Sequence, residues 1–211
     1  MDDPHLIYFA DPMCSWCWGF APVIAATKAR YGEALPIRLV LGGLRPGTVE
    51  PMSRAARAEL PTHWEHVREA SGQAFNAEAF IARDGFVYDT DPACRAVVAA
   101  RRQDARAALP FLVAAQSAFY AEGLDVTQAP VLETIAVALG LDPVRFAADL
   151  ASEEVKEETW GDYAVSQSAG VRGFPTLIAG RNLDGTYAMV TRGFQTEGPV
   201  LAALDAWLAA R

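Results

Sequence analysis

Two cysteines separated by two residues constrain this chain more than any other feature. Cys14 and Cys17 follow the apolar run at 6–10, and residues 20–30 have a helical composition. The pair is therefore predicted to lie where a buried strand turns into the N-terminus of a helix. Unpaired backbone N–H groups and the helix dipole favour a thiolate at such a position. Residues three apart in the first helical turn are also close enough to form a disulfide.

This placement predicts thiol–disulfide exchange. We expect Cys14 to face solvent and attack a substrate disulfide, while Cys17, one turn deeper, resolves the mixed disulfide. The main alternative for the pair is half of a zinc site, and an inert pair also stays open. A tetrahedral zinc needs two more ligands, which Cys94 and a histidine could supply, but no second ligand pair has matching spacing. We therefore predict redox chemistry and no bound metal.

Composition argues against several classes of function. The 211 residues carry a net charge of −8, which disfavours binding to nucleic acid or to an acidic membrane. No apolar run approaches the ~18 residues that a membrane-spanning helix needs. The acidic start of the chain does not resemble a secretory signal, and three cysteines fit catalytic use better than a disulfide scaffold. We therefore expect a cytoplasmic protein.

The predicted strands and helices form three blocks in the order β-α-β, a long helical stretch, and β-β-α. The strands are expected at 6–10, 36–41, 176–179 and 186–192, with a turn at 181–185 before the last strand. The helical stretch runs from about 51 to 170, and the final helix begins near 199. The two outer blocks together would form one mixed sheet, so the predicted fold class is α/β with a large helical insertion.

Prolines mark several helix boundaries in this reading. Asp91-Pro92 and Asp142-Pro143 each offer an N-cap side chain followed by proline at the first helical position. In the first helix, Pro22 is expected to introduce a kink.

Two separated motifs and the order of elements carry a resemblance to a known superfamily. The CSWC motif at 14–17, the GFPT motif at 173–176 and the topology together resemble the thioredoxin superfamily. The large helical insertion is similar to that of the DsbA-like branch. Within that branch, the segments 11–20 and 88–95 most resemble the FrnE-type protein-disulfide isomerase group. The implied fold is thioredoxin-like, with an all-helical insertion between the β-α-β and β-β-α halves.

The resemblance assigns roles to residues beyond the cysteines. It implies that Pro175 is a cis-proline that lies against the active-site cysteines, and that the backbone of Phe174 pairs with a bound substrate. Ser15 can hydrogen-bond at the start of the helix. Trp16 either offers an apolar platform for a substrate beside the sulfur or packs on the insertion.

The resemblance also implies a domain organisation and a set of partners. Residues 1–48 and 171–211 would form a discontinuous thioredoxin-like domain, and residues 49–170 a helical insertion domain. The implied substrates are protein or small-molecule thiols and disulfides, with glutathione as a candidate co-substrate. No cofactor is expected beyond the redox-active disulfide Cys14–Cys17. Whether the enzyme is an oxidant, an isomerase or a reductant stays open, because the dipeptide between the cysteines is Ser-Trp where exported DsbA enzymes have Pro-His.

Two other functions stay open. Kappa-class glutathione transferases and 2-hydroxychromene-2-carboxylate isomerases share the inserted-helix architecture, and they bind glutathione with a hydroxyl, usually serine, at the first cysteine position. Cysteine at both positions argues against a glutathione-dependent isomerase or transferase here. The second alternative is a non-catalytic redox sensor in which the disulfide acts as a conformational switch.

Three further residues could bind a metal or take part in redox chemistry. Cys94 is expected to be structural, because buried free cysteines pack as small hydrophobes. His63 and His66 could share a metal on one helix face, but no further ligand completes a site. We therefore predict that the two histidines form a solvated surface pair.

Overall fold

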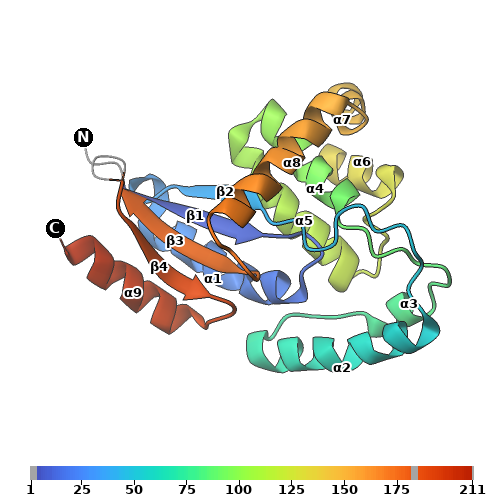
Figure 1. Ribbon diagram of the computed structural model, residues 1–211, viewed down its shortest axis with the longest axis horizontal. Coiled ribbons are helices and arrows are strands. Elements are labelled where there is room, and N and C mark those ends of the chain that lie inside the picture. The colour runs from blue at the N-terminus through green and yellow to red at the C-terminus, as the bar shows by residue number, and fades with distance from the viewer. Residues whose placement is uncertain (1–3, 182–184, 211) are drawn as a thin grey trace.

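A four-stranded mixed sheet lies at the centre of one half of the molecule (Figure 1). The structure is a computed structural model that describes residues 4–181 and 185–210. Its strands are β1 (Pro4–Ala10), β2 (Ile37–Leu41), β3 (Thr176–Arg181) and β4 (Tyr187–Arg192). The strand order is β2-β1-β3-β4, in which β1 runs parallel to β2 and antiparallel to β3, and β3 runs antiparallel to β4.

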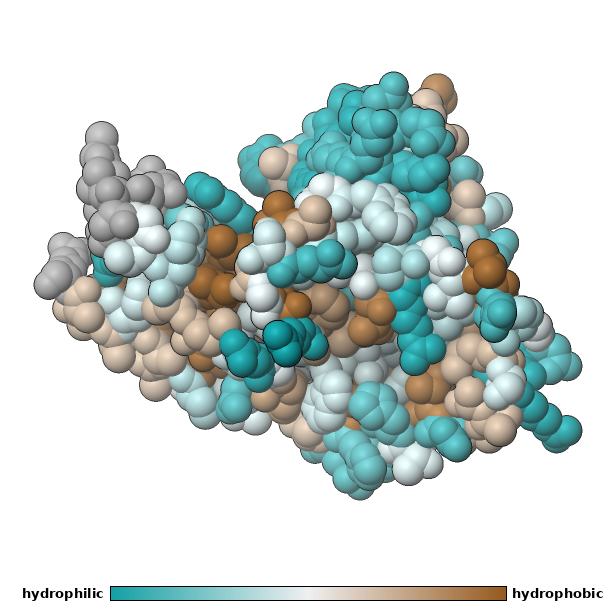
Figure 2. Space-filling view, in the orientation of Figure 1, coloured by the Kyte–Doolittle hydropathy of each residue, from teal (hydrophilic) through white to brown (hydrophobic). Residues whose placement is uncertain are grey.

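The helices surround this sheet unevenly. Those of the described residues are α1 (Ser15–Tyr31), α2 (Arg54–Ser71), α3 (Ala77–Ile81), α4 (Asp91–Gln103), α5 (Ala108–Tyr120), α6 (Ala129–Ala138), α7 (Pro143–Leu150), α8 (Glu153–Ser168) and α9 (Glu197–Ala209), with short 3-10 turns η1 (Gly32–Ala34) and η2 (Ala105–Ala107). Helices α1 and α9 pack beside each other, α9 contacts β4, and α8 packs on β2. Figure 1 shows α2 to α8 gathered on the other side of the molecule from α9. In the same orientation, hydrophobic residues are visible in the hollow between these two halves (Figure 2).

The observed order confirms the predicted fold class, and each predicted strand is present with bounds shifted by one or two residues. Part of the predicted turn at 181–185 lies outside the described residues, because these omit 182–184. Helix α1 continues through Pro22 to Tyr31. In the described part of the chain, no helix is both long and apolar enough to cross a membrane.

Strand β1 is an inner strand of the sheet, which explains its apolar sequence. It pairs with β2 on one edge and with β3 on the other. Side chains on both of its faces are buried, including Leu6, Tyr8 and Phe9. Because β1 is fixed from both sides, the turn that follows it is held in a defined place at the carboxyl end of the strand.

An aromatic cluster fixes α2 against the rest of the insertion. The Trp64 ring of α2 lies 4.9 Å from Phe80 and 5.3 Å from Tyr120, measured between ring centroids. Trp64 itself is 1% exposed. Aromatic pairs at these separations contribute about 0.5–1.5 kcal/mol each beyond the area they bury. The cluster therefore positions α2, including His63, which precedes Trp64 in the sequence.

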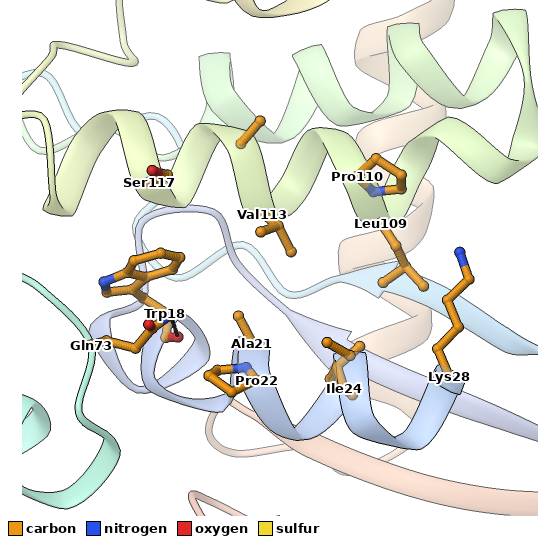
Figure 3. A pocket seen from close by; sticks show the side chains of 12 residues that line it. Trp18, Ala21, Pro22, Ile24, Lys28, Gln73, Leu109, Pro110, Val113 and Ser117 are labelled. Atoms are coloured by element: carbon orange, nitrogen blue, oxygen red, sulfur yellow. Dashed lines mark hydrogen bonds between the residues drawn. The ribbon is translucent and has the colours of Figure 1, made fainter. Parts of the chain in front are cut away.

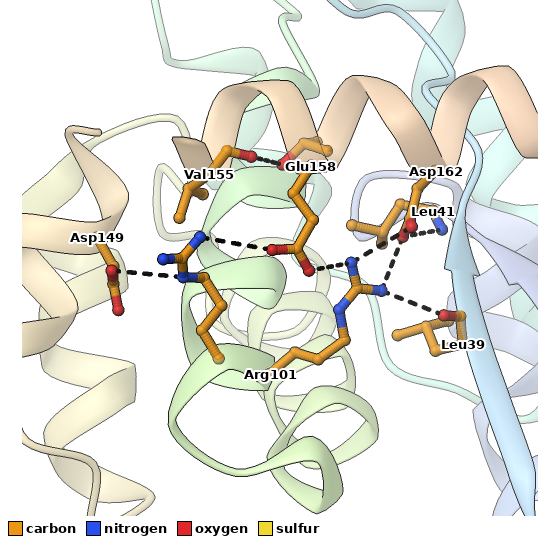
Figure 4. Close-up of polar contacts among 9 residues, drawn as sticks. Leu39, Leu41, Arg101, Asp149, Val155, Glu158 and Asp162 are labelled. Carbon is orange, nitrogen blue, oxygen red and sulfur yellow. Dashed lines mark hydrogen bonds and ion pairs between the residues drawn. The ribbon is translucent and has the colours of Figure 1, made fainter. Parts of the chain in front are cut away.

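Arg101 of α4 connects the helical block to the sheet (Figure 4). Its guanidinium donates to Asp162 Oδ2 and to Glu158 Oε1 of α8, each at 2.9 Å. It also lies 3.5 Å from the carbonyl oxygen of Leu39 in β2. Asp162 in turn accepts a hydrogen bond from the backbone N–H of Leu41 at 3.0 Å. We call these five residues the Arg101 junction.

The two predicted N-caps have different outcomes. Asp142 caps α7 as predicted, accepting hydrogen bonds from the first backbone N–H groups of that helix. The prediction for Asp91 is wrong by one position, because Thr90 is the N-cap and Asp91 is the first residue of α4. The Asp91 carboxylate instead accepts from Arg95 Nε one turn along α4 at 2.6 Å and from the Tyr163 hydroxyl of α8 at 3.2 Å.

Candidate active site

Cys14 caps helix α1, and Cys17 lies in its first turn. The backbone of Cys14 is extended (φ −94°, ψ 115°), and α1 begins at the next residue. The Cys14 carbonyl accepts hydrogen bonds from the N–H groups of Cys17 at 3.0 Å and Trp18 at 3.1 Å. Both cysteines are free thiols, and they stand 3.5 Å apart. The predicted position of the pair at a strand-to-helix turn is confirmed.

The two thiols differ in exposure and in chemistry. Cys14 keeps 7% of its surface exposed, whereas Cys17 is at 0%. Cys14 is the outer and Cys17 the inner thiol, as predicted. The prediction that Cys14 faces solvent is wrong, because Cys14 is largely covered. Burial raises the pKa of the Cys17 thiol well above its usual value, and the hydrogen bond to Cys14 and the charge of Cys14 raise it further. At neutral pH Cys17 is consequently a protonated thiol.

The loop before β3 lies over Cys14. The Cys14 thiol donates to the carbonyl oxygen of Phe174 at 3.6 Å. The Phe174–Pro175 peptide bond is cis, as the resemblance implied, and Pro175 is buried. The Phe174 ring packs on the backbone of Gly42 after β2, where a Cβ atom would overlap the ring. Because the Phe174 carbonyl already contacts the outer thiol, a substrate bound along this loop would lie beside Cys14. The substrate-binding role of Phe174 and Pro175 stays a prediction.

The two residues between the cysteines contact α2 and the segment after β4. Ser15 Oγ and His63 Nε2 share a hydrogen bond of 3.1 Å. The Trp16 ring is half-buried and lies 6.0 Å from the His63 ring and 5.3 Å from the Phe194 ring, between centroids. Trp16 therefore packs partly on the insertion, which is one of its two predicted roles. Its use as a platform for a substrate stays a prediction.

His63 is a site residue that the sequence did not reveal. Both His63 and His66 are exposed, as predicted, but His63 also reaches the CSWC motif through Ser15. Partial burial and the charge of His66 lower the pKa of His63, so the imidazole is neutral at pH 7. The contact joins positions 48 residues apart. No local sequence signal reports such a contact.

Asp11 is a buried carboxylate beside the cysteine pair. It is fully buried and accepts from the N–H groups of Met13 at 2.8 Å and Leu44 at 2.7 Å. The Cys94 thiol donates to it at 3.5 Å. Burial raises the pKa of the Asp11 carboxyl, and the two backbone N–H groups oppose that shift. Asp11 thereby ties the loop after β2 to the active-site turn. Cys94 is fully buried, as expected of a structural thiol.

An open cleft of about 600 Å³ lies next to the site, between α2 and the loop after β2. Its lining residues are Arg45, Met52, Ala56, Glu59, Leu60, Thr62, His63 and His66. His63 lies in the wall of this cleft and also contacts Ser15, so one side chain joins the cleft to the CSWC motif.

A second cavity, of about 500 Å³, lies between α1 and α5 and is lined mainly by apolar side chains (Figure 3). Its walls include Trp18 and Ile24 of α1 and Leu109 and Val113 of α5. Neither cysteine lines it. This cavity is therefore separate from the thiol chemistry.

The zinc alternative finds no further ligands nearby. Within residues 4–181 and 185–210, no group of three or more His, Cys, Asp or Glu side chains is placed to hold a metal ion. The Cys94 thiol is directed to Asp11, and the His63 ring is directed to Ser15. The group nearest to each thiol of the pair that could react with it is the other thiol, 3.5 Å away.

Comparison with known proteins identifies the family of the chain. The sequence profile of the family described as Thioredoxin matches residues 8–196, a range that includes the cysteine pair, the insertion and the cis-proline. The chain belongs to the thioredoxin family. Solved structures with the same fold include a probable DsbA oxidoreductase from Streptomyces coelicolor, which at 18% identity and a TM-score of 0.72 shares the fold alone.

Two solved structures are similar over nearly the whole chain. A candidate protein disulfide isomerase from Nitrosomonas europaea is 37% identical, with 98% of both chains covered and a TM-score of 0.89. The cytosolic disulfide reductase DsbM from Pseudomonas aeruginosa is 27% identical, with 98% of this chain and 100% of DsbM covered and a TM-score of 0.79. DsbM has also been solved with GSH. The 2-hydroxychromene-2-carboxylate isomerase structure, at 16% identity and a TM-score of 0.63, shares the fold alone.

A curated relative has a different kind of role. The ClpXP adapter protein SpxH from Bacillus subtilis is 28% identical over 175 residues, which make up 82% of this chain and 58% of SpxH. The chain thus spans about three-fifths of the length of the curated relative that it matches.

Proposed function

We propose that this thioredoxin-family protein is a thiol–disulfide oxidoreductase in which Cys14 attacks and Cys17 resolves. One observation supports the proposal above the others. Two free thiols stand 3.5 Å apart at a helix N-terminus, and the outer one contacts the carbonyl that precedes a cis-proline. Cys14 is the outer thiol and can reach a substrate, and the buried position of Cys17 keeps it from reacting with solvent thiols.

The reaction has two steps. The Cys14 thiolate attacks one sulfur of a substrate disulfide, the substrate S–S bond breaks, and the first substrate sulfur leaves and takes up a proton. Cys17 then loses its proton and attacks Cys14 Sγ. The Cys14–Cys17 disulfide forms, the mixed disulfide breaks, and the second substrate sulfur leaves as a thiol. The substrate is reduced by two electrons and the cysteine pair is oxidised by two.

We further propose that the substrates are protein or small-molecule disulfides in the cytoplasm and that glutathione restores the reduced pair. The named activity and GSH complex of DsbM support this direction and this co-substrate. The cleft beside His63 and Ser15 gives room for a small thiol on Cys14. No cofactor other than the redox-active pair is part of the proposal.

The test is the redox equilibrium of the pair against glutathione, followed by thiol trapping and mass spectrometry. A reversible Cys14–Cys17 couple within or below the cytosolic range of roughly −220 to −320 mV supports a reductant, and a higher potential supports an oxidant or isomerase. Cys14→Ser should abolish exchange, Cys17→Ser should accumulate mixed disulfides on Cys14, and the matched control Cys94→Ala should exchange normally. Wild-type exchange rates in Cys14→Ser would refute the proposal.

Two other functions are separated by the same variants. A glutathione-dependent isomerase would convert a chromene substrate even after loss of Cys17, whereas a thiol–disulfide exchange enzyme would not convert that substrate. A binding role, as an adapter or redox sensor, is favoured by the SpxH relative and by the apolar cavity between α1 and α5. It would show no disulfide turnover in the wild type, together with a redox-dependent change in association.

A further inference from the structure

The hydroxyl of Tyr8 is buried beside the cysteine pair with no partner. Tyr8 lies on β1 at 1% exposure, and its ring packs 6.0 Å from the Phe20 ring of α1, between centroids. Among the described residues, its hydroxyl makes no hydrogen bond of acceptable geometry. Leaving a buried hydroxyl unpaired costs about 1–3 kcal/mol. Native proteins contain few unpaired buried polar groups, so each one calls for an explanation, such as a partner that forms in another state of the protein.

The polar group that this hydroxyl faces is the Cys17 thiol. Cys17 precedes Phe20 by three residues on the buried face of α1, so the Tyr8 ring that packs on Phe20 also lies against the Cys17 turn. In agreement with this placement, burial raises the pKa of Tyr8 and the two cysteines, Cys17 before Cys14, raise it further. The other buried phenols near the site are paired, since the Tyr88 hydroxyl donates to the Met13 carbonyl at 2.6 Å and lies 3.3 Å from the Tyr120 hydroxyl. Tyr8 therefore differs from its neighbours in having only a thiol in front of it.

The protonation state of Cys17 decides whether Tyr8 finds a partner. A thiol sulfur is a weak acceptor, so the pair makes no good bond in the reduced protein. A thiolate is a charged acceptor, and hydrogen bonds to charged groups are about twice as strong as neutral ones. We infer that the Tyr8 hydroxyl donates a hydrogen bond to the Cys17 thiolate during the resolving step of the proposed exchange reaction, and so acts as a catalytic residue.

The role follows the proposed mechanism without adding a reactant. Tyr8 keeps its own proton, because burial and the nearby cysteines raise the pKa of its phenol. When Cys17 ionises, the O–H bond points to the new negative charge, and the bond is released when Cys17 Sγ bonds to Cys14 Sγ. The charge ends on the departing substrate sulfur, which takes up the proton that Cys17 lost. Besides Tyr8, the titratable groups of the described residues that act on Cys17 are Cys14, the N-cap residue of α1, and Asp11 in the turn before it.

The test separates the two chemical steps with one probe. Reduced protein is mixed with 5,5′-dithiobis(2-nitrobenzoate), which releases one coloured thiolate when Cys14 attacks and a second when Cys17 resolves. In Tyr8→Phe we expect an unchanged first phase, a second phase about tenfold slower, and a pH profile of that phase moved upward by about one unit. The matched control is Tyr120→Phe, which loses an equally buried hydroxyl that pairs with Tyr88. Both of its phases should equal those of wild type.

Several outcomes would overturn the inference. One is a second phase in Tyr8→Phe with the wild-type rate and pH profile. Another is a clear loss of thermal stability in reduced Tyr8→Phe, because the hydroxyl would then have a partner before Cys17 ionises. The inference rests on the proposed exchange function. If wild-type protein itself releases no second thiolate, the proposed function fails first, and this result is distinct from a normal wild type with a normal Tyr8→Phe.

Discussion

The Arg101 junction holds partly buried polar groups and the cysteine site holds buried ones, and the two regions differ in how these groups are paired. At the Arg101 junction the guanidinium meets two carboxylates and a carbonyl, and Asp162 also accepts from a backbone N–H (Figure 4). At the cysteine site the Tyr8 hydroxyl is unpaired and Cys17 lies in surroundings that disfavour its charged form. At the Arg101 junction the paired polar groups join helices to the sheet. At the cysteine site the Tyr8 hydroxyl lacks a hydrogen bond and lies beside the sulfur atoms that react.

The comparison predicts where a substitution affects stability and where it affects chemistry. A paired, partly buried ion cluster such as the Arg101 junction is stable until one partner is removed, which leaves uncompensated charge. Unpaired or protonated groups cost stability in the resting protein and become useful only when charge develops on a reacting atom.

The largest effect is expected at the Arg101 junction. Arg101→Met removes the cation shared by Glu158 and Asp162, and we expect a loss of about 2–4 kcal/mol in the free energy of unfolding. Urea denaturation of the reduced protein measures this. Exchange by the folded fraction should stay at the wild-type rate, because Arg101 does not line the cysteine site. The exposed ion pair of Arg106 and Asp104 provides the control, since Arg106→Met should leave the free energy of unfolding close to the wild-type value. Equal losses in the two variants would contradict the contrast drawn between the regions.

At the cysteine site, the contrast predicts that the rate of the resolving step depends on pH. The pKa of Cys17 is raised by burial first and then by Cys14, so the reactive thiolate is a minor species at neutral pH. Once the mixed disulfide has formed, Cys14 no longer titrates. The rate of resolution should therefore rise about tenfold per pH unit from neutral pH toward the pKa of Cys17. Release of the second thiolate, followed at several pH values, measures it. A flat profile above pH 7 would mean that Cys17 already ionises there.

The same shift predicts a difference in stability between the two redox states. Because the folded protein holds the Cys17 proton more tightly than the unfolded chain, this stabilisation is fully present below the unfolded thiol pKa of about 8.5. It is lost as pH rises through the higher folded value. Reduced protein should therefore lose stability in alkaline solution relative to the disulfide form, which has no Cys17 proton to release. Thermal unfolding of both forms across that range checks the sign.

A smaller effect is expected where the wall of the site meets Phe174. In Gly42→Ala the added methyl group overlaps the Phe174 ring, so the ring and the carbonyl that contacts Cys14 must shift. Overpacking of this kind costs about 1–3 kcal/mol, and we expect the first exchange step to slow with it. Gly161→Ala is the matched control, because its Cβ meets open space within α8. It should stabilise the protein by up to ~1 kcal/mol and leave exchange unchanged. Normal exchange in Gly42→Ala would show that the Phe174 contact is dispensable.

Local signals in the sequence were enough to place β1, the cysteine turn and the start of α1, because each depends on residues within a few positions. The cis-proline at Pro175 came from the resemblance and is present. The predicted N-cap at Asp91 is wrong by one residue, since Thr90 and Asp91 are both suitable caps, and the Asp91 carboxylate contacts Tyr163, 72 residues away. Boundaries of this kind depend on packing and not on propensity.

The parts of the site that sequence could not supply all join distant segments. Whether Tyr8 faces Cys17 depends on how β1 packs beneath α1, and the Leu44 contact of Asp11 depends on how the loop after β2 folds back. The exposure of Cys14 was overestimated for the same reason, because the segment that covers it is 160 residues away. A pattern of residue types carries the chemistry of a site, whereas its degree of burial depends on the whole fold.

The smallest predicted effect tests whether α2 belongs to the cysteine site or only borders it. His63→Ala removes the hydrogen bond to Ser15 and the edge contact with Trp16, and a bond at this half-exposed position is worth about 0.5–1.5 kcal/mol. We expect exchange with glutathione disulfide to slow by about 2- to 10-fold.

His63→Gln, whose amide can still reach the Ser15 hydroxyl, should recover part of the loss. His66→Ala, one turn along the same exposed face, should behave as wild type. Because the aromatic cluster at Trp64 holds α2 in place in all three variants, a difference between His63 and His66 reflects the contact itself. Equal rates in His63→Ala and His66→Ala would place α2 outside the reacting site and leave the chemistry to the residues around Cys17.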